Sequence, residues 1–291
     1  MAANTSAAFV QAKGLRLSLE QFYAIWRAEL TMQWRRRGLW IAFAMITVLF
    51  ILISSLRLKV QIDHYLARVG PASVVAFLTS AYLYYFVAIL CIVVGLLVVD
   101  RIKRDESSGI TDVQRSTCLS MASYVWGKFL GNYCALVVPC FFSSILLLIS
   151  FIVAGVTPAI SVAFCLSTLL ILLPSCAIVV AFMLLFATLV PLRIAQVGFP
   201  VLWLWAVIAP LGWPSPADTV LSPIELYAAE YWFYDPQQTL ADLEKSGFTL
   251  MNAWLNAIAV PLCACLFLLL LIIALRIRTR YRTAKRGSKY A

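Results

Sequence analysis

Long apolar stretches alternate with short polar ones along most of the 291-residue chain. A helix rises about 1.5 Å per residue, so about 20 apolar residues cross the hydrocarbon core of a bilayer. Six stretches reach or approach that length, and each is predicted to be a membrane-spanning helix. They are 39–56, 72–99, two spans within 129–190 that a turn at 155–158 divides, 195–211 and 253–275. The pattern therefore predicts an all-α membrane protein with six transmembrane helices in residues 39–275.

The segment before the first span follows a different pattern. Between residues 15 and 38, apolar side chains recur at helical spacing, and arginines fill the other faces. Such a helix is expected to lie in the headgroup plane, with its aromatic rings toward lipid and its arginines toward phosphate. The residues that define this interface helix are Trp26, Trp34, Arg35, Arg36 and Arg37. Residues 1–14 are small and polar, and we expect them to form a flexible tail.

Composition and charge agree with a membrane protein and predict its orientation. Apolar residues make up 63% of the chain and charged residues 12%, whereas soluble domains carry about 25% charged residues. The net charge of +10 comes from residues that flank the spans, which favours membrane lipid over nucleic acid as a partner. Four of the 23 basic residues lie on one predicted side: Arg57, Lys59, Arg68 and Lys245. The positive-inside rule therefore places both termini, including the basic tail 276–291, in the cytoplasm.

Residues 212–251 form a segment that this orientation places outside the cell. The segment is acidic and rich in aromatic residues, a composition that suits the membrane–water boundary. We expect it to form short external helices and to act as a lid over an exit pathway. Six aromatic residues are the candidates for the pathway or the lid, with packing or interfacial anchoring as the alternative: Tyr82, Tyr85, Trp203, Trp205, Trp232 and Phe233.

The segment 100–128 is a polar island between the second and third spans. Hydrocarbon offers no partners to its backbone and charges, so it is expected to lie in water. Glu106 and Gly109 begin a turn, and residues 110–117 have the potential to form a short helix. Gly127 and Lys128 then lead into the next span. These two residues also begin a small-xxx-small pattern that ends at Gly131 and can pack helices, although a turn at the mouth of the span is the preferred interpretation.

This arrangement resembles the cytoplasmic coupling segment of ABC-2 type transporter permeases. That family has an acid-rich start, a glycine, a short helix, a Thr-Pro-x-Ser turn and a Gly-Lys pair. Gly109, Thr117, Ser120 and the Gly127-Lys128 pair fit this spacing, whereas Cys118 stands in the position of the usual proline. The generic alternative is a basic cytoplasmic loop. The resemblance assigns contact with an ATPase to Asp105, Glu106, Gly109, Asp112, Arg115, Thr117, Cys118 and Lys128.

The resemblance also implies partners and a location. Two permease subunits, identical or related, would pair in the inner membrane of a bacterium above two copies of a cytoplasmic ABC ATPase. ATP and Mg²⁺ would be bound by that partner, so this chain is expected to need no cofactor of its own. The cargo of such an exporter is expected to be amphiphilic or hydrophobic: a peptide, drug, lipid or glycan. A membrane scaffold or channel with no energised transport is the alternative.

Other chemistry has little support in the sequence. The chain lacks a Walker A motif, a zinc-protease motif and a cluster of metal ligands, so we expect it to be no enzyme by itself. Its cysteines lie mostly in apolar runs, where small packing residues are expected. No charged residue occurs between Lys128 and Arg193. Because ion-coupled transporters place ionisable groups inside their spans, the energy for transport would have to come from outside this chain.

Overall fold

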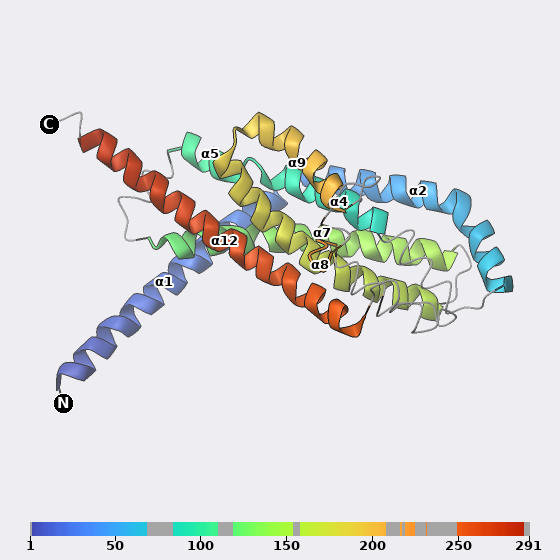
Figure 1. Cartoon of the computed structure of the whole chain (residues 1–291), viewed down its shortest axis with the longest axis horizontal. Coiled ribbons are helices and arrows are strands. Elements are labelled where there is room, and N and C mark those ends of the chain that lie inside the picture. The colour runs from blue at the N-terminus through green and yellow to red at the C-terminus, as the bar shows by residue number, and fades with distance from the viewer. Residues whose placement is uncertain are drawn as a thin grey trace.

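The computed structural model describes residues 2–68, 84–109, 119–153, 158–207, 216, 219–224, 231 and 249–287. Within these ranges the chain is helical and contains no strand. The helices are α1 (Ala2–Trp34), α2 (Arg37–Arg68), α4 (Tyr84–Val98), α5 (Arg101–Ser107), α7 (Met121–Val153), α8 (Pro158–Leu189), α9 (Leu192–Val207) and α12 (Leu250–Gly287). The predicted all-α fold is therefore confirmed for the described part of the chain (Figure 1).

Four described helical segments are long and apolar enough to cross a membrane. They are Tyr84–Ser107, Met121–Val153, Thr168–Leu189 and Leu250–Tyr281. A fifth arises if α1 and α2 are one broken span, since Ser18–Trp34 and Arg37–Ile53 pass the same test together across a bend of 61°. Helix α9, with 16 residues, is shorter than the usual span. The described residues thus fit a multi-pass membrane protein with four or five candidate spans.

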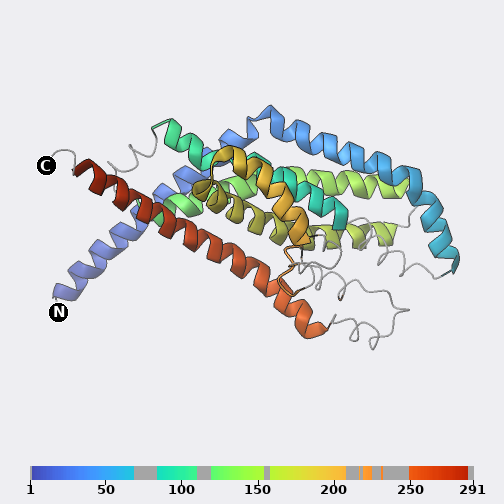
Figure 2. The same cartoon turned by 45° about the horizontal axis from the view of Figure 1, so that its top comes forward.

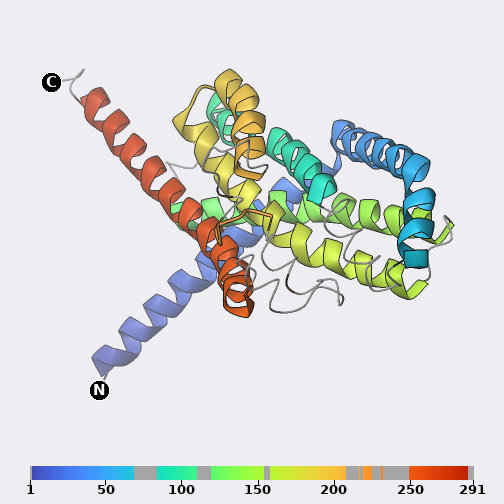
Figure 3. The same cartoon turned by 45° about the vertical axis from the view of Figure 1, so that its right-hand side comes forward.

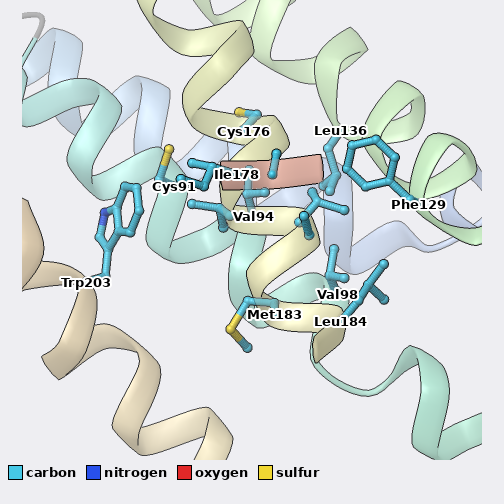
Figure 4. Packing of buried hydrophobic residues seen from close by; sticks show 14 of the residues in the cluster. Cys91, Val94, Val98, Phe129, Leu136, Cys176, Ile178, Met183, Leu184 and Trp203 are labelled. Carbon is cyan, nitrogen blue, oxygen red and sulfur yellow. The ribbon is translucent and has the colours of Figure 1, made fainter. Parts of the chain in front are cut away.

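Helix α8 is the centre of the bundle. It carries no charged residue, and it packs against α4, α7 and α12. A helix that is apolar on every side belongs in a core or in lipid. Figure 4 shows its residues Cys176, Ile178 and Met183 between Val94 of α4 and Leu136 of α7. All five are buried, and α7 and α8 run side by side (Figure 3).

Both chain termini lie at the same end of the molecule. The N-terminal part of α1 and the C-terminal part of α12 project beyond the bundle there, and α5 lies near that end (Figures 1 and 2). This arrangement agrees with termini on one side of the membrane. That this side is the cytoplasm stays a prediction from the charge pattern.

Three helices are longer than the sequence pattern predicted. The expected flexible tail 1–14 is helical from Ala2, α2 continues through the expected loop as far as Arg68, and α12 runs on through the basic tail to Gly287. These extensions hold good helix formers such as Ala, Leu, Arg and Lys. The first glycine and proline after α2 are Gly70 and Pro71. The predicted boundaries followed hydropathy, which marks where lipid ends and not where a helix ends.

The Gly127–Gly131 pattern lies inside α7 and not in a turn, so the preferred interpretation was wrong. Helix α1 packs mainly on α7, and the two glycines make room for it. A Cβ atom at Gly131 would lie 2.6 Å from the Cβ of Glu29 and 2.9 Å from the carbonyl oxygen of Trp26. At Gly127 it would lie 3.0 Å from the side chain of Ile25. The pattern is therefore a packing face within one chain.

Candidate functional site

The candidate site is a network of polar and charged side chains where α1, α5 and α7 meet at the end of the bundle that holds the termini. We call it the charge network. Its members come from three stretches that are far apart in the sequence, and most of them are buried. They are Glu29, Gln33, Arg36, Asp100, Arg101, Asp105, Tyr124, Lys128 and Asn132.

Lys128 of α7 joins the other two helices. Its Nζ donates hydrogen bonds to Glu29 Oε1 of α1 and, over 2.7 Å, to Asp105 Oδ2 of α5. The lysine is 1% exposed, Glu29 4% and Asp105 8%. The Tyr124 hydroxyl donates to the same Asp105 oxygen over 2.8 Å, and the ring of Tyr124 lies 5.6 Å from Nζ. One buried cation thus satisfies two buried acids from different elements.

Three amide and guanidinium groups extend the network along α1. Asn132 Nδ2 donates to Glu29 Oε2 over 3.3 Å and to the carbonyl of Lys128 over 2.7 Å. Gln33 Nε2 donates to Asn132 Oδ1, and Arg101 Nη2 donates to Gln33 Oε1, each over 2.5 Å. The side chain of Gln33 therefore bridges α7 and α5 from its place on α1.

The network ends at the break between α1 and α2. Arg36 Nη2 donates to Asp100 Oδ2 over 3.0 Å, and its Nη1 donates to the carbonyl of Leu97 over 3.2 Å. Arg101 Nε lies 3.6 Å from Asp100 Oδ1. The three acids Glu29, Asp100 and Asp105 thus face three cations, and the network is neutral as a whole.

The pairing of charges in the network couples the movement of α1, α5 and α7. Removing one partner from a buried ion pair costs about 3–5 kcal/mol, because the other charge is left in a medium of low dielectric constant. Sliding α1 or α5 away from α7 would leave Glu29 or Asp105 unpaired in this way. The three helices are therefore expected to move together as one unit.

Helix α5 also reaches beyond this unit. Lys103 Nζ donates to the carbonyl of Val190, in the turn between α8 and α9, over 2.8 Å. Glu106 forms an ion pair with Arg278 of α12. A helix of seven residues is thus attached to α1, α7, α12 and the α8–α9 turn. Gly109, with a φ of 72°, ends the described part of this segment in a left-handed conformation that glycine adopts readily.

The structure places the residues of the expected ATPase contact in different surroundings. Asp105 and Lys128 are buried and bonded to each other, so neither side chain lies at the surface in this structure. Glu106 is only partly exposed and is paired with Arg278 of the same chain. Gly109 lies at a surface turn next to residues 110–118, which lie outside the described residues. The expected contacts that fall in that range are Asp112, Arg115, Thr117 and Cys118.

The arginines of the expected interface helix point in different directions. Arg35 and Arg37 are exposed, as a helix beside headgroups requires, whereas Arg36 turns inward to Asp100. Trp34 is 45% exposed, and its carbonyl accepts a hydrogen bond from Trp40 Nε1 over 3.2 Å. Trp26 is partly buried, and its ring centroid lies 5.4 Å from that of Tyr23.

The aromatic pathway candidates separate into different environments. Trp203 is buried, and its Nε1 donates to the carbonyl of Ala88 over 3.0 Å. Trp205 is 40% exposed and Tyr85 is 53% exposed. Both tryptophans line an apolar pocket of about 550 Å³ between α8, α9 and α12. Tyr82, Trp232 and Phe233 lie outside the described residues.

Sequence reasoning missed most of the charge network. It named Asp105, Lys128 and Arg36, but not the partners that give them their role. A signal was present, because Glu29 and Gln33 are four residues apart, as are Lys128 and Asn132. Residues at this spacing share a helix face. One polar pair lies on an amphipathic helix and the other at the start of an apolar helix. Their equal spacing indicates that the two helices could pack with these polar side chains in contact.

Comparison with protein-family models and with curated proteins gives no match. No protein-family model matches this chain, and no curated protein matches it at a significant level. The described residues also contain no group of His, Cys, Asp and Glu side chains that could hold a metal ion.

Proposed function

We propose that this chain is the membrane permease subunit of an ATP-driven exporter of the ABC-2 type. In this proposal α2 and α9 also cross the membrane, giving six spans. Two such subunits work with two cytoplasmic ATPase subunits, and ATP binding moves the segment around α5. The observation that carries the proposal is the charge network. It attaches the segment that resembles a coupling segment to both α1 and α7, so a push on that segment reaches a long apolar helix.

The distribution of charge supports an external energy source. Lys128 is the one charged residue within Met121–Val153, and Glu29 and Asp105 neutralise it. Helix α8 and residues 250–275 of α12 carry none. Ion-coupled transporters keep ionisable groups at mid-membrane for the coupling ion. The described spans offer no such group, and a separate ATPase would supply the missing energy.

The apolar pocket supports a hydrophobic or amphiphilic cargo. Phe182 of α8 is its central ring, with ring centroids 5.4 Å from Phe267 of α12 and 6.3 Å from Phe199 of α9. The pocket volume is within the range of about 300–1,000 Å³ that is typical of small-molecule sites. Its wall is almost entirely apolar, which disfavours a strongly hydrated cargo.

The decisive experiment is purification of the tagged chain from its native cells, followed by identification of bound proteins. We expect an ATPase with a Walker A motif to co-purify, and its hydrolysis rate to rise when the chain is added in a bilayer. Exchange of Lys128 for Met should lower that stimulation. A chain that binds no ATPase in any detergent or bilayer tested would instead indicate a scaffold or a channel.

A further inference from the structure

A second pocket lies between α8 and α12, toward the end of the molecule that holds the termini. Its volume is about 460 Å³. Its lining combines an apolar floor with polar groups toward the C-terminal end of α12. The lining residues are Thr188, Leu189, Ala274, Leu275, Ile277, Arg278 and Tyr281. Leu275 is 9% exposed and Tyr281 is 72% exposed, so the pocket opens toward the end of the helix that carries Arg278.

The polar end of this pocket is positively charged. Arg278 is 36% exposed, and its Nη1 atom bonds to Glu106. A guanidinium has five N–H donors, so Arg278 can bind a phosphate while it keeps this partner. Lys103 adds a second cation nearby, since its Nζ bonds to the carbonyl of Val190, the residue after pocket-lining Leu189.

We propose that this pocket binds one anionic phospholipid. Its acyl chain lies along Leu189, Ala274 and Leu275, and its phosphate is bound by Arg278. Basic pockets between membrane helices bind anionic headgroups, and the charge around Arg278 favours a lipid with a net negative charge over a zwitterionic one. The inference requires only that α8 and α12 lie in a bilayer. It therefore does not rest on the proposed exporter function and can fail or succeed separately.

The test uses the full-length chain in nanodiscs of phosphatidylcholine with a minor fraction of phosphatidylglycerol. The protein is then extracted, and the retained lipids are quantified by mass spectrometry. We expect phosphatidylglycerol to be enriched over its share of the bilayer. Arg278→Gln should lower this enrichment about fivefold, since one basic side chain near a membrane surface contributes about 1 kcal/mol toward an anionic lipid.

Three further variants separate the pocket from other causes. Arg276→Gln removes an exposed arginine of the same helix outside the pocket lining and should keep the enrichment near wild type. Glu106→Gln removes the ion pair but keeps Arg278, so enrichment should stay the same or rise. Ala274→Phe keeps every charge but fills the pocket, and should abolish the enrichment.

Two results would overturn the proposal. Equal losses in Arg276→Gln and Arg278→Gln would indicate a general attraction of the basic surface. Full enrichment in Ala274→Phe would show that no acyl chain occupies the pocket. Size-exclusion profiles and phosphatidylcholine retention of each variant serve as the folding control.

Discussion

At the scale of single residues, Lys128 shows how position changes the role of a charge. The sequence places it at the edge of an apolar run, where a basic residue is expected to reach water or phosphate. In the structure it is 1% exposed and lies between Glu29 and Asp105. Burial removes the ammonium group from water, and this desolvation is unfavourable. Attraction to two anionic partners offsets that cost, whereas a buried cation without partners would have nothing to offset it.

Replacement of Lys128 by Met tests this role. The change keeps most of the side-chain volume but leaves Glu29 and Asp105 without their cation, so we expect a loss of about 3–5 kcal/mol in stability. The measurement is thermal unfolding of the purified chain in detergent. Exposed Arg104 of α5 provides the control, since Arg104→Met should change stability by no more than about 0.5 kcal/mol. Equal melting temperatures for the two variants would contradict the role given to Lys128.

Gly131 permits a second test of the same contact. An added methyl group would meet Glu29 and the backbone of Trp26 at less than normal contact distances, so Gly131→Ala should destabilise the chain by about 1–3 kcal/mol. Gly198 in α9 is the matched control, because the nearest atom to a Cβ there lies 3.9 Å away. Gly198→Ala should be neutral or stabilise by up to about 1 kcal/mol. Similar unfolding curves for both variants would show that α1 does not pack closely on Gly131.

At the scale of elements, α5 is notable for how many neighbours it contacts with so few residues. Successive side chains reach the α8–α9 turn, α7 and α12 through Lys103, Asp105 and Glu106. These contacts differ in strength. The Asp105 pair is buried, whereas the Glu106–Arg278 pair is partly exposed and is expected to contribute at most about 1 kcal/mol. The attachment to α7 should therefore be lasting and the attachment to α12 easy to break.

A charge exchange between α5 and α12 tests the weaker attachment. Glu106→Arg places two cations together and should destabilise the chain, whereas the double variant Glu106→Arg/Arg278→Glu should recover the loss. A double-mutant cycle on unfolding free energies should give a coupling of about 0.5–1 kcal/mol.

The same variants separate two roles for Glu106. If Glu106 acts only within this chain, the double variant should also recover binding of the proposed ATPase partner. Recovered stability with binding still lost would show that Glu106 contacts the ATPase directly. A coupling of zero would show that the ion pair with Arg278 contributes nothing in solution.

At the scale of the whole molecule, the positions of the helix ends determine which segments could contact a partner on one side of the membrane. The projecting ends of α1 and α12 and the α5 segment lie toward one end (Figure 1). If that end faces the cytoplasm, the described ends of α1 and α12 and helix α5 lie on the side of the proposed ATPase. For the acidic segment 212–251, the charge pattern predicts the opposite side.

Cysteine labelling in intact cells tests this orientation. In a background without native cysteines, Gln237→Cys should react with an impermeant maleimide, whereas Ser107→Cys should react only after the cells are opened. Ser107 is exposed in the structure, so protection from the reagent would result from the membrane and not from burial. The reverse labelling pattern would contradict both the orientation and export from the cytoplasm.

The sequence by itself determined the class of the protein and the approximate place of its apolar helices. Hydropathy is a local property that twenty consecutive residues carry by themselves, so α7, α8 and α12 could be predicted without knowledge of their neighbours. The same property cannot mark where a helix ends in water. For that reason the extensions of α1, α2 and α12 were missed.

Only the tertiary structure decided which polar residues form a site. Glu29 and Lys128 are 99 residues apart, and nothing local to either one indicates that they meet. Their contact depends on how α1 lies on α7, and this depends on the space that Gly127 and Gly131 leave. Burial then changed the meaning of the charges, because a lysine that would be a surface contact in water becomes, beside two acids in the interior, the residue that holds three helices together.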